Sequence, residues 1–188
     1  MKTIEYEQFT NITFTQAEFE EGEYLECKFT GCNFSSLNIK NTDFIDCFFT
    51  NCDLTSTSFM NTTMKDARFE SCKLLGVDFS SIVDFLFSVS FSGCNLNFTL
   101  FINKKLKSTS FKCCSLKEAL FEKCNLTAAK FDKCDLSNAI FTQNNLEKAD
   151  FSTSSNYFFN LDSNKVKGAI FSYPDVIRLF DRYQIKVI

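Results

Sequence analysis

Apolar side chains recur at every fifth residue along most of this chain. One series runs without a break from Phe9 to Phe79, and a second, shifted by two residues, runs from Phe91 to Phe151 with Phe and Leu alternating. An α-helix repeats every 3.6 residues and a strand every 2, so neither accounts for a period of five. The period instead predicts a solenoid. Each five-residue step is one side of a four-sided coil, and successive coils hydrogen-bond as short parallel strands about 4.8 Å apart.

Residues 20 apart should then stack on one another, and the sequence meets this condition. Every centre in one column is Phe, and the opposite column is mainly Phe as well. Stacked aromatic pairs contribute about 0.5–1.5 kcal/mol each beyond the burial of their area. We therefore expect two facing aromatic ladders in the core. The first comprises Phe9, Phe29, Phe49, Phe69, Phe91, Phe111, Phe131, Phe151 and Phe171; the second comprises Phe19, Ile39, Phe59, Phe79, Phe101, Phe121, Phe141 and Leu161.

The two additional residues fall within the segment 80–90, and they add a bulge, because the columns continue on both sides of it. The segment divides either into two six-residue steps, with Phe85 at a centre, or into a step centred on Leu86 that turns Asp84 inward. In the second division, Lys104 stands at an inward position one coil after Asp84. Either the two charges pair, or this corner of the coil opens to water.

Individual steps such as "CNLTA", "AKFDK", "CDLSN" and "ADFST" carry a common motif of a small residue, then a polar residue, then Leu or Phe. This motif resembles that of pentapeptide-repeat proteins, and the resemblance covers roughly residues 4 to 171. It implies an all-β solenoid, a right-handed quadrilateral parallel β-helix of about eight coils. We accordingly expect one repeat domain over residues 1–171, with the bulge at 80–90, followed by residues 172–188 as a capping helix and an apolar tail.

The chain contains 10 Cys, and "CKFTGC" followed by "CFFTNC" superficially resembles paired metal ligands. All but Cys113 stand two residues before a centre, where other steps have Ala. A small inward residue suits that corner, and a free Cys behaves as a small hydrophobe, so packing explains these residues better than a metal does. Cys113 points outward beside Lys112, and it is the thiol that we expect to react. The packed group is Cys27, Cys32, Cys47, Cys52, Cys72, Cys94, Cys114, Cys124 and Cys134.

Catalysis has little support in this composition. The chain has no His, so it lacks an imidazole base and a nucleophile activated by one. Its 5 Gly never form a phosphate-cradling loop, and a filled solenoid offers no cleft for paired carboxylates. We therefore expect no enzyme activity and no cofactor.

The N-terminal "MKTIEYEQFT" lacks the basic and apolar regions of a secretory signal, and no apolar run approaches 18 residues. We expect a cytoplasmic protein that does not bind a membrane. The net charge of −3 divides unevenly, as −7 over residues 1–79 and +4 over residues 80–188. This distribution argues against direct binding of nucleic acid.

Three departures from the repeat are candidates for partner binding. The first is the acidic run "EFEEGEYLEC", although such runs are most often simply solvated. The second is the bulge, whose apolar side chains exceed what one coil needs, because loops that interrupt a rigid scaffold often bind. The alternative for the bulge is a register repair whose apolar residues fold inward. The candidate partner-binding residues are Glu18, Glu20, Glu21, Glu23 and Glu26 in the run, and Ile82, Asp84 and Phe87 in the bulge.

The third departure is the C-terminal "FSYPDVIRLFDRYQIKVI". Pro174 and Asp175 are typical of a helix start, and apolar residues follow on one face, so the segment is expected to cap the core beneath Phe171. In several pentapeptide-repeat proteins a C-terminal helix joins two molecules end to end, which implies a homodimer here. The candidate dimer contacts are Leu179, Phe180, Tyr183, Ile185 and Val187.

Two functions remain open. The chain is either a rigid scaffold or adaptor for a protein partner, or a DNA mimic. The DNA-mimic function follows from the resemblance, because Qnr-type members of the family resemble DNA and bind type II topoisomerases. The resemblance therefore implies DNA gyrase or topoisomerase IV as a partner and an effect on quinolone sensitivity. Eight coils span roughly 38 Å at about 4.8 Å each, and duplex DNA of that length carries on the order of 22 charges. The net charge of −3 leaves only the N-terminal half able to imitate DNA.

Overall fold

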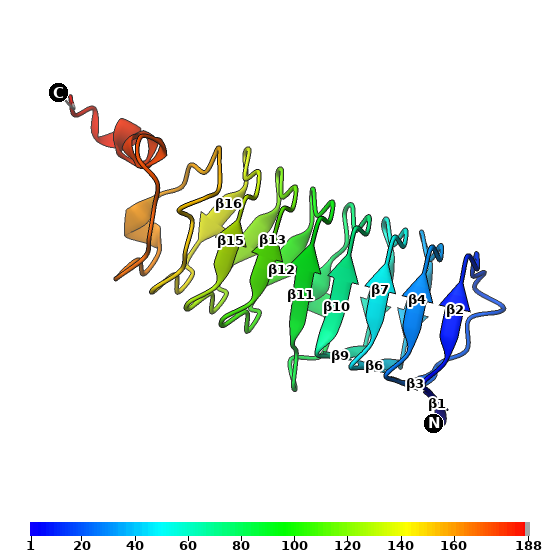
Figure 1. Cartoon of the computed structure of the whole chain (residues 1–188). Coiled ribbons are helices and arrows are strands. Elements are labelled where there is room, and N and C mark those ends of the chain that lie inside the picture. The colour runs from blue at the N-terminus through cyan, green and yellow to red at the C-terminus, as the bar shows by residue number, and fades with distance from the viewer. Residues whose placement is uncertain (187–188) are drawn as a thin grey trace.

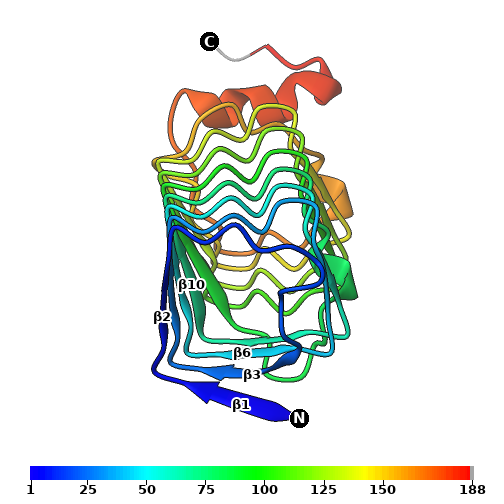
Figure 2. The ribbon, with the colours of Figure 1, turned by 90° about the vertical axis from the view of Figure 1, so that its right-hand side faces the viewer.

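The chain forms a right-handed solenoid of stacked four-sided coils (Figure 1). The computed structural model describes residues 1–186, with the backbone alone for Arg182. Seen from the N-terminal end, the chain runs clockwise as it recedes from the viewer, and the four sides are distinct (Figure 2). All strand pairs are parallel, and paired residues are 20 apart, as in the pair Phe9 and Phe29, or 22 apart across the bulge, as in Phe69 and Phe91.

Each side of the coil stacks into a face of the solenoid, and we number the faces in chain order. Face 1 is a seven-stranded sheet, and face 2 has only isolated bridges, from Thr13 and Asn33 through to Asp135 and Ser155. The strands of face 1 are β2 (Gln8–Thr10), β4 (Lys28–Thr30), β7 (Phe48–Thr50), β10 (Ala67–Glu70), β11 (Val89–Ser92), β13 (Ser110–Lys112) and β15 (Lys130–Asp132).

Faces 3 and 4 are each interrupted near the middle of the solenoid. Face 3 has β5 (Asn38–Lys40) and β8 (Ser58–Met60), then the short 3-10 helix η1 (Phe79–Ser81), then β12 (Leu100–Ile102), β14 (Leu120–Glu122), β16 (Ile140–Thr142) and the 3-10 helix η2 (Leu161–Ser163). Face 4 has β1 (Lys2–Glu5), β3 (Gly22–Leu25), β6 (Asp43–Ile45) and β9 (Thr63–Lys65), and it resumes after residues 82–88 as isolated bridges that begin with Lys105 and Asn125.

The two aromatic ladders that the sequence predicts lie in the core. On face 1, neighbouring rings from Phe9 to Phe171 are stacked, with centroids 4.8 Å apart for Phe49 and Phe69 and 5.4 Å apart for Phe91 and Phe111. On face 3, the rings from Phe79 to Phe141 stack in the same way, as in the 4.6 Å pair Phe79–Phe101. The two ladders meet edge to face, so the core is continuous.

The nine Cys two residues before a centre are buried, whereas Cys113 is exposed, as the repeat predicts. The structure adds a role that the pattern did not show. The Sγ of Cys72 donates to the carbonyl oxygen of Phe49 in the preceding coil at 3.2 Å, and the Oγ1 of Thr57 donates to that of Phe34 at 2.8 Å. Several of the thiols and polar side chains at this position of the repeat therefore donate a hydrogen bond to a backbone carbonyl of the preceding coil.

The C-terminal end of the stack is covered by a 3-10 helix, η3 (Asp175–Tyr183), which follows Pro174 as expected. Its Leu179 is buried, and Val176 packs against the same core as Phe171. The segment thus caps the last coil. Among residues 1–186, no helix combines the length and the hydrophobicity needed to cross a membrane.

Candidate functional site

The bulge forms a loop that projects beyond the neighbouring coils next to β11 (Figure 1). We call residues 83–88 the bulge loop. Both of its ends are tied to the preceding coil. The backbone N–H of Val83 donates to Thr62 O, and that of Ser88 donates to Met64 O, each at 2.9 Å. The Oγ of Ser88 also donates to Asp66 Oδ1 at 2.8 Å. These bonds fix where the bulge loop leaves and rejoins the solenoid.

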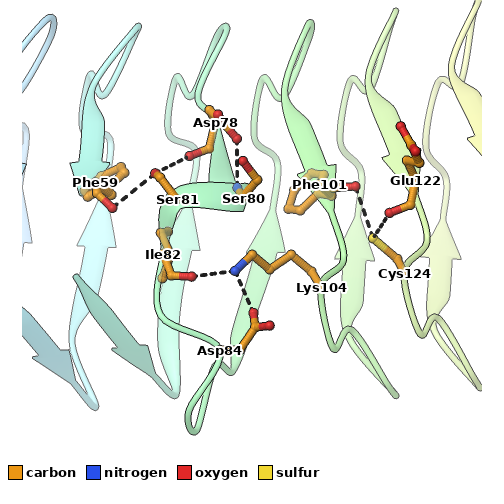
Figure 3. Close-up of polar contacts among 10 residues, drawn as sticks. All are labelled: Phe59, Asp78, Ser80, Ser81, Ile82, Asp84, Phe101, Lys104, Glu122 and Cys124. Carbon is orange, nitrogen blue, oxygen red and sulfur yellow. Dashed lines mark hydrogen bonds and ion pairs between the residues drawn. The ribbon is translucent and has the colours of Figure 1, made fainter. Parts of the chain in front are cut away.

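Lys104 holds the base of the bulge loop from inside the solenoid (Figure 3). Its side chain is only 2% exposed, and its Nζ donates to Ile82 O at 2.5 Å and to Asp84 Oδ1 at 2.6 Å. The same Nζ lies 5.2 Å from the ring centroid of Phe87, within the range of a cation–π contact. The predicted pairing of Lys104 with Asp84 is thus confirmed.

Lys104 occupies the inter-coil donor position of the repeat. One coil later, Cys124 at the same position donates its S–H to Phe101 O at 3.1 Å (Figure 3), and two coils later Asn144 donates to Phe121 O at 2.9 Å. The bulge displaces the chain, so a longer side chain is needed to reach the carbonyl oxygen of Ile82. Lysine supplies that reach, and its remaining N–H groups satisfy Asp84.

The orientation of the bulge residues corrects both divisions suggested by the sequence. Phe85 is 72% exposed and Leu86 is 53% exposed, so neither is an inward centre. Ile82 and Phe87 are buried instead, and they fill the core that the interrupted face 4 leaves open. Their side chains are therefore not available to a partner in this structure. Of the predicted bulge contacts, only Asp84 reaches the surface, and its carboxylate already binds Lys104.

Two functional candidates, Phe85 and Leu86, were missed by the sequence analysis. The signal that could have found them is the number of apolar side chains in "IVDFLF", which exceeds the inward positions of one coil. Sequence alone could not say which of them point outward. Leu86 has a φ of 59°, which turns the chain back at the tip of the bulge loop.

The acidic run lies on the first full coil but does not form one uninterrupted surface. Glu20 pairs with Lys2, and Glu21 lies 4.0 Å from Lys40 and accepts a hydrogen bond from Asn41 at 3.2 Å. Glu18 accepts from the Oγ1 of its neighbour Thr15, and Glu23 lies on β3 of face 4, next to the turn that holds Glu26. Basic and amide groups are thus interspersed among these carboxylates.

The candidate dimer contacts at the C-terminus include both buried and exposed residues. Leu179 is buried against the last coil, so it cannot contact a second molecule, which corrects its assignment as a dimer contact. Phe180 is half-buried, with its ring 6.4 Å from that of Tyr183, and Tyr183 donates to Asp162 Oδ2 at 2.7 Å. Ile185 is exposed. Val187 lies outside the described residues, and the homodimer stays a prediction.

Two of the buried thiols, Cys47 and Cys124, are held in the protonated form by their surroundings. Burial raises the pKa of Cys47 to about 12 and that of Cys124 to about 11, so both are protonated at neutral pH. In the described part of the chain, no group of three or more His, Cys, Asp or Glu residues is arranged to hold a metal ion. The surfaces of the solenoid are therefore the candidates for function. The bulge loop, with its base held by hydrogen bonds and its tip apolar, differs most from the repeat.

Comparison with known proteins places this architecture in a family. The model described as "Pentapeptide repeat region" matches residues 23–99, and the model described as "Pentapeptide repeats (8 copies)" matches residues 90–127 and 119–155. No curated protein matches the sequence significantly.

One similar solved structure is that of HetL from the cyanobacterium Nostoc sp. strain PCC 7120, a pentapeptide repeat protein involved in heterocyst differentiation regulation. The two structures align with a TM-score of 0.71 at 17% sequence identity, and the alignment covers 90% of this chain and 86% of HetL. A trypsin-treated variant of QnrB1, a plasmid-mediated fluoroquinolone resistance protein, aligns over 100% of both chains at 19% identity with a TM-score of 0.48. The family models together match residues 23–155, and the coils are those of the corresponding fold, so this chain belongs to the pentapeptide-repeat family.

Proposed function

We propose that this protein is a non-enzymatic scaffold that binds a protein partner through the tip of the bulge loop. The observation that carries the proposal is the pair Phe85 and Leu86, which are 72% and 53% exposed at the end of a loop whose base is held by Lys104. Large exposed apolar side chains on an ordered loop are typical of interface anchors. A loop that is already fixed loses little conformational entropy on binding, so more of the contact energy contributes to affinity.

The partner that fits this site has an apolar pocket wide enough for an aromatic side chain, because the tip is convex and carries Phe85 at its end. Asp84 lies beside the tip, but Lys104 compensates its charge. The recognition is therefore expected to depend on apolar contact more than on charge, and to be only weakly sensitive to salt.

Photo-crosslinking tests this proposal. The residue p-benzoylphenylalanine is placed at position 85 in one variant and at Tyr6, an exposed aromatic residue on the first coil, in a control. We expect a discrete crosslinked partner from position 85 alone. Phe85→Ala should then weaken binding of the purified partner by about 30-fold, the effect of losing a central anchor, while Tyr6→Ala should change it by less than about twofold. Equal crosslinks at both positions, or equal affinities, would contradict the proposal.

Binding to a type II topoisomerase, DNA gyrase especially, is the second candidate. The observation that favours it is the exposed acidic run on the first full coil, which includes Glu20, Glu21 and Glu26. The charges of Lys2 and Lys40 beside these carboxylates weaken the imitation of a DNA backbone. The scaffold is therefore the better supported function.

Supercoiling by purified gyrase, titrated with this protein with and without a fluoroquinolone, tests the second candidate. A variant with Glu20, Glu21, Glu23 and Glu26 changed to Lys is the matched control. Inhibition, or protection from the drug, that the variant loses would support mimicry by the acidic end. If a large molar excess has no effect, the topoisomerase hypothesis is wrong, and the bulge-loop proposal is untouched because it uses different residues.

A further inference from the structure

In one column of face 3, the outward side chains change from polar to apolar halfway along the solenoid. In this column, Asn38 pairs with Ser58 in the first half, and Asp78 pairs with Leu100 at the centre. From there the column continues as Leu100, Leu120 and Ile140 on β12, β14 and β16, in parallel register. We call these three residues the apolar ladder.

The apolar ladder is not required by the fold. Outward positions do not pack in the core, and the polar residues of the first half of the same column show that the coils form without apolar residues there. Ile140 is 55% exposed, and Leu100 and Leu120 are partly exposed. Three outward aliphatic side chains in one row, on a flat sheet, therefore form a surface suited to contact with another molecule.

At Ile140 the apolar ladder leads into a cavity of about 680 Å³. The cavity exists because the last coil leaves the five-residue frame. Asn156 stands where a centre is expected, but Tyr157 and Phe159 are buried in its place, which leaves Phe158 51% exposed. Ile140 and Phe158 line the cavity together with Arg178 of η3.

The spacing of the apolar ladder distinguishes between classes of occupant. Neighbouring coils are about 4.8 Å apart, whereas side chains on one side of an extended peptide recur about every 6.8 Å. The side chains of a strand lying along the apolar ladder would therefore drift from the ladder residues by about 2 Å at each step. An α-helix presents a side chain on one face about every 5.4 Å, close to the coil spacing. The ladder therefore matches a helix laid parallel to the solenoid axis.

Charge at the end of the apolar ladder adds a second requirement. Arg178 is exposed at the cavity and makes no ion pair with any other residue among those described. The nearby charges Glu122 and Lys123 pair with each other at 3.0 Å, so they do not decide the sign of the site. An acidic side chain one helical turn beyond the last apolar residue would reach the guanidinium, with which a carboxylate can form two hydrogen bonds.

We propose that the apolar ladder and the Arg178 cavity form a docking site for an amphipathic helix of a partner protein, with one apolar side chain per turn followed by an acidic residue. The site lies on face 3, whereas the bulge loop projects from the place where face 4 is interrupted. The proposal is therefore independent of the function assigned to the bulge loop.

A defined peptide tests the proposal without knowledge of the natural partner. The probe is a capped, fluorescent helical peptide of about 20 residues, with Leu at every third or fourth position on one face and a Glu one turn beyond the last Leu. The control peptide has the same composition with its Leu residues distributed around the helix. By fluorescence anisotropy, we expect the full-length protein to bind the probe at least about tenfold more tightly than the control peptide.

Protein variants locate the binding. Leu120→Lys should weaken binding of the probe by at least about tenfold, and Ile140→Lys should do the same. Ser58→Lys, in the same column but before the apolar ladder, should change binding by less than about twofold. Both Leu120 and Ser58 point outward, so all these variants are expected to fold, which circular dichroism verifies.

A charge swap tests the role of Arg178. Arg178→Glu should weaken binding of the Glu probe, and a probe with Lys in place of its Glu should restore binding to that variant. Equal binding of probe and control peptide, no effect of Leu120→Lys, or no restoration by the swapped charge would each overturn the proposal. If sedimentation shows a dimer that Leu120→Lys converts to a monomer, the apolar ladder is an interface between two copies of this chain, and the proposal is likewise wrong.

Discussion

The Nζ of Lys104 lies 2.6 Å from Oδ1 of Asp84, and only one of the two partners is buried: the lysine side chain is 2% exposed and the aspartate side chain 46%. A buried cation needs an anion, whereas a half-exposed anion is also solvated by water. The pair is therefore asymmetric. Lys104 depends on Asp84 more than Asp84 depends on Lys104.

This asymmetry predicts how three variants rank in the free energy of unfolding that they lose. Asp84→Ala leaves the ammonium of Lys104 buried without its counter-ion, and we expect it to lower the free energy of unfolding by about 3 kcal/mol or more. Lys104→Met removes the charge with similar volume and leaves Ile82 O without its donor, at a cost of about 1–3 kcal/mol. The double variant should resemble Lys104→Met. Urea denaturation measures all three, and a double variant whose loss equals the sum of both single losses would show that the residues act independently.

The stacked rings of face 1 are expected to dominate the stability of the solenoid. Phe111 is fully buried, and its ring stacks between those of Phe91 and Phe131 at 5.4 and 4.9 Å. Phe111→Ala creates a cavity in the middle of this ladder and should lower the free energy of unfolding by about 3–5 kcal/mol. Ser110→Ala, at the outward neighbour, should change it by less than about 0.5 kcal/mol. Similar losses for the two variants in urea denaturation would argue against an aromatic core.

The ten thiols should divide sharply in reactivity. Cys113 is exposed and the other nine Cys are buried, so a reagent in water reaches only Cys113 in the folded molecule; burial also holds the pKa of Cys47 well above neutrality. Because the thiolate is the reactive form, a thiol reagent should modify one group per folded molecule and the remaining groups only after denaturation. Cys113→Ser should abolish the fast phase. Rapid modification of several thiols in the folded Cys113→Ser variant would show that the coils open readily.

Acid should destabilise the protein partly through Asp135. Partial burial would by itself raise the pKa of this carboxyl, but hydrogen bonds from Ser137 and Asn156 and the ammonium of Lys117 outweigh it and hold the pKa at about 2. The unfolded carboxyl titrates near pH 3.9, so only the unfolded state binds a proton between about pH 4 and pH 2. The stabilisation by Asp135 is therefore complete above about pH 4 and is lost as the pH falls toward 2.

The variant Asp135→Asn checks this assignment, because asparagine keeps the shape and does not titrate. The urea midpoint of the variant should fall less than that of the parent protein between about pH 5 and pH 2.5. The same decline in both proteins would mean that other carboxyls control the acid sensitivity. Asp53 and Asp150 are the alternatives, because the pKa of each is also lowered and each accepts a hydrogen bond from the backbone N–H two residues later.

The sequence by itself determined the coil, its four sides and its two aromatic columns. A period of five, kept over so many steps, leaves each centre only one way to face the core, and residues 20 apart can only stack. The inward Cys and the outward Cys113 follow from the same register, and the capping segment follows from Pro174 and the apolar residues after it. These features are local and repetitive, so the pattern of side chains is sufficient to specify them.

The tertiary structure decided what happens where the repeat fails. In the bulge, the sequence suggested Phe85 or Leu86 as the inward centre and Ile82 and Phe87 as partner contacts, whereas the space left by the interrupted face 4 is filled by Ile82 and Phe87. The cavity beside Phe158 arises in the same way, from a coil that departs from the frame. The position of Arg178 depends on how η3 packs on the last coil. Such choices depend on contacts between segments distant in sequence, and for that reason the candidate binding surfaces became visible only in the folded chain.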